Sequence, residues 1–168
     1  GLHQSPPNSI LMSLALFLTA YIMSPVLEKA YHDGVVPYTQ EKISETEAVD
    51  RIAKPLKQFM LQHVREKDLS LFMNLSQGSK AEKPEQIGLG VLVPAFMISE
   101  LRRAFEIGFL LFIPFLVIDM VVASILMSMG MMMLPPITLS LPFKVIFFVL
   151  IDGWVLLAGS LVKSYGLS

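Results

Sequence analysis

Residues 107–134 read IGFLLFIPFLVIDMVVASILMSMGMMML, and this stretch decides the fold because Asp119 is its only charged residue. An uncharged run of this length is typical of a helix that can cross a membrane. Pro114 is expected to kink that helix. The run ends in Gly130, three methionines and Leu134, and the two prolines that follow prevent the helix from continuing. The sequence therefore predicts a long apolar helix that ends in a methionine-rich loop.

Further apolar segments precede and follow this stretch. Residues 10–27 carry no charge, and residues 145–162 carry only Asp152. At about 1.5 Å per residue, each of these segments would form a helix of about 27 Å, which is just long enough to span a bilayer. A helical pattern leading into the central run begins near Val93. No strand-like alternation occurs, so we expect an all-α, membrane-associated protein with long kinked apolar helices.

The middle of the chain is polar and is also expected to be helical. Ser44 and Glu47 have the spacing of a capping box, and apolar residues recur after them with a helical period. Pro55 suits the first turn of a second helix, so the preceding helix is expected to end just before it. Asp68 is expected to cap a further short helix that ends at Leu75.

The expected helices divide the chain into three segments. Residues 1–27 are expected to form an apolar helix, residues 28–92 a polar helical region, and residues 93–168 an apolar helical hairpin with the methionine-rich loop. Residues 78–84 have no apolar anchor and are predicted to be a loop.

Composition excludes several classes of function. Only 16% of the 168 residues are charged and 54% are hydrophobic, whereas soluble domains contain about 25% charged residues. Residues 28–106 hold 11 bases and 12 acids, so the chain lacks both the basic surface that nucleic acid requires and the Lys/Arg excess of a cytoplasmic loop. The polar region is therefore expected on the outer side of a membrane. There is no cysteine, the three histidines are scattered, and no phosphate-binding loop is present, so we expect no metal and no cofactor.

Met131, Met132 and Met133 are the candidate functional residues of the loop. Methionine is unbranched and polarizable, so three in a row can fill an irregular gap and re-pack when something larger arrives. These properties suit a constriction. The alternative is that these side chains simply pack against lipid or neighbouring helices.

Asp119 and Asp152 allow two other interpretations. Two carboxylates on neighbouring apolar helices could share a proton, as in an intramembrane aspartyl protease. They could also serve an ion-coupled transporter, but such proteins usually contain inverted repeats, and the three unequal apolar segments show none.

Four motifs carry a family resemblance. They are PAFMISELRRAFEIGF at residues 94–109, MMMLPP at 131–136, SLPFK at 140–144 and VLIDGW at 149–154. With these motifs the chain resembles the FliP family of flagellar type III export-gate proteins, and also the related SctR (YscR-like) proteins of injectisomes, with the flagellar branch closer. Family members have a signal sequence and an apolar segment upstream, so this sequence is expected to be a piece of a longer protein.

The resemblance implies a protein-conducting channel with no catalytic residues. About five copies would join FliQ and FliR, with FlhB and FlhA as further partners, in the bacterial inner membrane at the flagellar basal body. The assembly would project to the periplasmic side and pass unfolded flagellar subunits. Met131, Met132 and Met133 would form its constriction.

Lys144 is the only base in residues 104–162, and an unpaired charge in apolar surroundings is costly. It is therefore expected to have an acidic partner, with Glu100, Asp119 and Asp152 as candidates. Glu100 is preferred because it lies in another family motif, which implies a pair between subunits that supports assembly.

Overall fold

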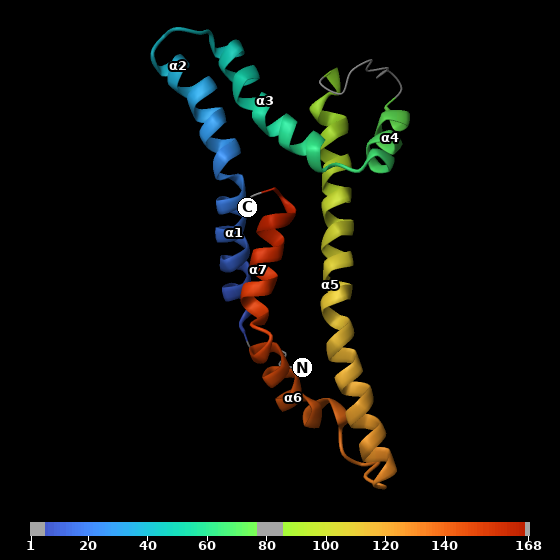
Figure 1. The fold of residues 1–168 in the computed structure, drawn as a ribbon. Coiled ribbons are helices and arrows are strands. Elements are labelled where there is room, and N and C mark those ends of the chain that lie inside the picture. Colours follow the sequence, from blue (N-terminus) through green and yellow to red (C-terminus); the bar gives the residue numbers. More distant parts are fainter. Residues whose placement is uncertain (1–5, 77–85, 167–168) are drawn as a thin grey trace. The chain divides into compact units, whose positions relative to one another are not determined.

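A computed structural model of the chain describes residues 6–76 and 86–166, which are helical apart from short turns (Figure 1). No strand occurs in these two ranges, so the predicted all-α class is confirmed. The loop predicted at residues 78–84 lies outside the described residues. In chain order the elements are α1 (Asn8–Ala30), a π-helical turn η1 (Tyr31–Val35), α2 (Val36–Thr39), α3 (Glu45–His63), α4 (Glu66–Leu75), α5 (Leu89–Ser128), α6 (Pro136–Leu150) and α7 (Gly153–Ser164).

The chain forms two compact units. One unit contains Gly1–Ala20 together with Glu106–Ser168, and the other contains Tyr21–Phe105. The boundaries between the units fall within the sequences of α1 and α5. The division into three segments at residues 27 and 92 remains a prediction.

In the unit formed by Tyr21–Phe105, η1 packs closely against α3. An added Cβ at Gly34 would lie 2.5 Å from Cγ1 of Ile52 and 3.1 Å from the backbone oxygen of Ala48. Only a residue without a side chain allows the two backbones to approach so closely. A small apolar core lies at the start of α5, where Ile87, Val91 and Leu92 are buried and Met60, Leu61, Val64, Leu69, Phe72 and Met73 pack against them.

The predicted start of α3 is confirmed. The side chain of Ser44 accepts a hydrogen bond from the backbone N–H of Glu47 at 3.3 Å. The prediction that Pro55 begins a second helix is wrong, because α3 continues through it as one helix. Pro55 is buried, and the apolar period is the same before and after it, so burial of one face offsets the lost backbone hydrogen bond.

The short helix α4 ends at Leu75 as predicted, but the prediction that Asp68 caps it is wrong. The N-cap residue is Arg65, and Asp68 lies in the first turn. A carboxylate is favourable anywhere in the first turn of a helix because of the helix dipole, so an acidic residue marks the turn and not the exact cap.

Two helical segments are long and apolar enough to cross a membrane among the described residues, namely Asn8–Thr39 and Leu89–Ser128. The first contains the predicted segment 10–27 and continues beyond Pro25. The second begins at Leu89, earlier than predicted, and runs through both of its prolines. It starts earlier because residues 91 and 92 are packed in the small core.

The prediction that residues 145–162 form one continuous helix is wrong, although α6 and α7 together are long and apolar enough to form a broken span. This segment is divided between α6 and α7, which are bent by 56° relative to each other (Figure 1). Asp152 lies between them in the left-handed conformation, with φ of 53°. Counting uncharged residues does not detect such a bend, although Asp-Gly is a common turn sequence.

Candidate functional site

The methionine loop, residues 129–135, joins α5 to α6 and is fixed at both ends. Gly130 has a φ of 72°, its N–H donates to the Met127 carbonyl at 3.1 Å, and the N–H of Met131 donates to the Leu126 carbonyl at 2.9 Å. This is the Schellman arrangement, which ends a helix at a glycine. At the other end, Pro135 is the N-cap residue of α6. The loop is therefore short and defined at both ends.

The methionine side chains of this loop project away from the chain. Met131 is 41% exposed, Met132 is 81% exposed and Met133 is 97% exposed. The chain thus presents apolar, deformable side chains to its surroundings at the tip of two apolar helices. Packing within this chain does not account for their position.

Asp119 on α5 and two residues of α6 form a polar cluster. The Ser140 hydroxyl donates a hydrogen bond to Oδ1 of Asp119, and Nζ of Lys144 lies 2.7 Å from the same oxygen. Ser140 is completely buried, while the Lys144 and Asp119 side chains are 15% and 23% exposed. Of the three acids considered for Lys144, the chain itself therefore supplies Asp119.

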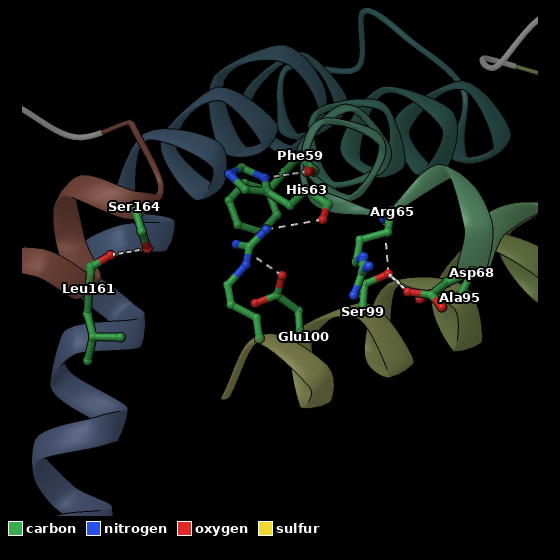
Figure 2. A network of polar contacts seen from close by, with 10 residues as sticks. Phe59, His63, Arg65, Asp68, Ala95, Ser99, Glu100, Leu161 and Ser164 are labelled. Atoms are coloured by element: carbon green, nitrogen blue, oxygen red, sulfur yellow. Dashed lines mark hydrogen bonds and ion pairs between the residues drawn. The ribbon is translucent and has the colours of Figure 1, made fainter. Parts of the chain in front are cut away.

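The preferred partner, Glu100, has a different neighbour in the chain. Its carboxylate lies 3.3 Å from Arg103 one turn further along α5, and Arg103 also donates to the backbone carbonyl of His63 at 3.4 Å. Figure 2 shows Glu100 close to the end of α3, where the His63 ring contacts the Phe59 carbonyl at 2.8 Å. Within the chain Glu100 thus belongs to the junction of α3 and α5, and its pairing between subunits remains a prediction.

Asp152 is exposed at the corner between α6 and α7. Among the described residues no hydrogen bond or ion pair joins it to Asp119, which is instead held by Ser140 and Lys144. The structure therefore does not bring the two carboxylates together as a pair that shares a proton.

Sequence reasoning missed a second polar cluster, which is buried and labelled in Figure 2. The Ser99 hydroxyl lies 2.8 Å from Oδ2 of Asp68 and accepts from the Arg65 backbone N–H at 3.0 Å. Ser99 and Asp68 are both buried. This cluster fixes the turn between α3 and α4 against α5.

Ser140 and Gly153 were also missed as structural determinants. Ser140 precedes Lys144 by four residues, so both lie on one face of α6, and this spacing was a usable signal. A Cβ at Gly153 would lie 2.3 to 2.6 Å from three ring atoms of Phe148. That close approach depends on the bend, so the sequence gives no signal for it.

Comparison with known proteins supplies the family. A model of the FliP family matches residues 1–161. The chain belongs to the FliP family. It is 59% identical over 165 residues to the flagellar biosynthetic protein FliP of Caulobacter vibrioides, 54% over 167 residues to that of Rhizobium meliloti, and 54% over 160 residues to that of Bacillus subtilis.

These FliP alignments cover 98%, 98% and 95% of this chain, but 62%, 68% and 72% of the respective relatives. The chain therefore spans only part of the length of these relatives. The FliP family match contains the methionine loop, the Asp119 cluster and the corner at Asp152, since all lie before residue 161. The resemblance to the FliP family drawn from the sequence motifs is thus confirmed.

Proposed function

We propose that this FliP-family chain is a core subunit of the bacterial flagellar type III export gate, a channel through which unfolded flagellar subunits pass. The observation that carries the proposal is the exposed methionine loop, which is held between two apolar helices. In this proposal Met131, Met132 and Met133 of several copies meet at the channel axis and form its constriction.

A conduit for unfolded chains must exclude ions when idle and yield to side chains of many sizes in use. Unbranched thioether side chains meet both requirements, because they make dispersion contacts when packed together and adapt to a new shape at low cost. Apolar constrictions can also close a pore by excluding water. The fixed ends of the loop support this role, because only the side chains need to move.

The apolar surface of the chain supports assembly with other subunits. Large hydrophobic side chains are exposed along its helices, among them Phe17, Phe105, Phe109 and Leu150. Such extensive apolar surface requires lipid or partner subunits to cover it. We infer about five copies of this chain, together with FliQ and FliR and in contact with FlhB and FlhA. The complex lies in the inner membrane at the basal body and projects towards the periplasm.

The proposed role is not enzymatic. The aspartyl protease hypothesis requires Asp119 and Asp152 to act on one proton, and the Ser140 and Lys144 contacts of Asp119 argue against that arrangement. The injectisome alternative is less favoured, since the relatives described above are flagellar biosynthetic proteins.

Ion conductance of the purified complex in planar bilayers tests the proposal. Replacing Met131, Met132 and Met133 together by alanine should leave assembly intact and make the resting complex leak, because alanine removes the bulk that fills the axis. Leucine replacements should seal the pore nearly as well but slow export, since branched side chains adapt less readily. A triple alanine variant as ion-tight as the parent would show that the loop is not the constriction.

A further inference from the structure

The helices α5 and α6, which flank the methionine loop, contact each other through a small set of paired residues. Phe115 and Asp119 lie one turn apart on α5, and Ser140, Lys144 and Phe147 lie on one face of α6. Asp119 meets Ser140 and Lys144, while the ring centroid of Phe115 lies 5.9 Å from that of Phe147. The two helices are thus joined in antiparallel register by one polar contact set and one aromatic contact.

The polar contacts are directional, whereas the aromatic contact is not specific to one register. Ser140 and Lys144 approach a single oxygen of Asp119, and Ser140 is completely buried. In apolar surroundings, separating these groups would leave an uncompensated charge. A contact of this kind is either made or broken, so it fixes the two helices at one separation and register.

The residues of this contact lie on the two helices that flank the methionine loop. Asp119 precedes Met131 on the helix that enters the loop, and Ser140 follows Met133 on the helix that leaves it. The contact therefore joins the helix that leads into the loop to the helix that leads out of it. We propose that Asp119, Ser140 and Lys144 form a polar clasp whose role is to position the methionine loop in its closed arrangement. This proposal rests on the loop being the constriction.

The clasp and simple charge compensation give opposite expectations for one double variant. Asp119→Leu with Lys144→Met removes both charges together, so neither is left unpaired, and replacing a buried ion pair by apolar residues is often neutral for stability. Assembly should therefore match that of the parent if Asp119, and not Glu100 of another subunit, is the partner of Lys144. The directional link between the helices is nevertheless lost, so the resting conductance of the purified complex in planar bilayers should rise by at least about tenfold.

A tenfold rise corresponds to a shift of only about 1.4 kcal/mol in a closed–open equilibrium. Ser140→Ala is a milder change that keeps the ion pair, and it should raise the resting conductance by about threefold. Ser124→Ala is its matched control, because within residues 6–76 and 86–166 the Ser124 hydroxyl donates only to the Met120 carbonyl of its own helix. This control should conduct like the parent.

The outcomes separate the clasp from the constriction. The proposal is overturned if the assembled double variant is as ion-tight as the parent, or if Ser140→Ala conducts no more than Ser124→Ala. The second comparison decides the matter if the double variant does not assemble. The triple alanine variant of the methionine loop serves as the reference. If that variant leaks and the clasp variants do not, only the clasp is wrong; if it is ion-tight, the constriction itself is wrong.

Discussion

Gly153→Ala is expected to destabilise the corner between α6 and α7, because the structure leaves no room for a methyl group there. A Cβ at this position would lie 2.3 Å from Cε2 and 2.6 Å from Cζ of the Phe148 ring. Carbon atoms pack best at about 3.5–4.0 Å, so the ring would have to move by about 1 Å or more. The centroid of that ring also lies 5.2 Å from the centroid of the Trp154 ring in an edge-to-face arrangement, which the movement would disturb.

The expected loss of stability follows from three contributions. Overpacking costs about 1–3 kcal/mol, and a disturbed aromatic pair costs up to about 1.5 kcal/mol. Replacing glycine by alanine in a helix stabilises the helix by up to about 1 kcal/mol, which offsets part of this loss. The net destabilisation should be about 1–3 kcal/mol. Gly159→Ala is the matched control on the same helix, since nothing lies within 4 Å of its Cβ position. It should be neutral or stabilise by up to about 1 kcal/mol.

The assay is equilibrium unfolding of the chain in mixed detergent micelles, followed by tryptophan fluorescence. Trp154 is the only tryptophan in the sequence and lies beside the altered residue, so the signal reports on this corner. Gly153→Ala should unfold at a lower denaturant fraction than the parent, and Gly159→Ala should not. Equal midpoints for the two variants would refute the argument that the close approach to Phe148 requires a glycine.

Two further predictions concern the unit formed by Tyr21–Phe105, and hydrogen exchange in detergent measures both. Gly34→Ala should destabilise the contact of η1 with α3 by about 1–2 kcal/mol and speed hydrogen exchange in α3, because the new Cβ would lie 3.1 Å from the α3 backbone. Gly108→Ala is the control and should have neither effect, because nothing lies within 4 Å of its Cβ position. Ser99→Ala should lower the free energy of unfolding by about 1–3 kcal/mol and speed hydrogen exchange in α4, because the buried Asp68 carboxylate loses the hydrogen bond from Ser99. Ser70→Ala, at an exposed position of α4, is the control and should change exchange little. Equal effects of the two serine variants would contradict the prediction.

The sequence was informative where the signal is local. The cap at Ser44, the end of α4 at Leu75 and the methionine-rich loop before Pro136 each depend on nearby residues, and each was predicted close to its observed place. The apolar helices were also predictable, because their length and lack of charge are properties of the sequence alone.

The sequence was uninformative where tertiary packing decides. Pro55 remains within α3 because the burial of one helix face outweighs a missing backbone bond, and no local rule gives that balance. The pairing of Lys144 with Asp119 depends on the register of α5 against α6. Any of three acids satisfied the charge argument, and only the antiparallel alignment of the two helices selects among them.

The most direct test of the central claim is to ask whether a chain in transit touches the methionine loop. The sequence contains no cysteine, so Met132→Cys would introduce a unique thiol at an 81% exposed position of the loop. In the assembled complex, this thiol should form a disulfide with a cysteine in an export substrate stalled during passage. Leu150→Cys, which is 79% exposed but lies at the end of α6, is the control and should not. Cross-linking at Met132 that depends on the stalled substrate is the predicted result, and no cross-link at Met132, or an equal yield at both positions, would contradict the account.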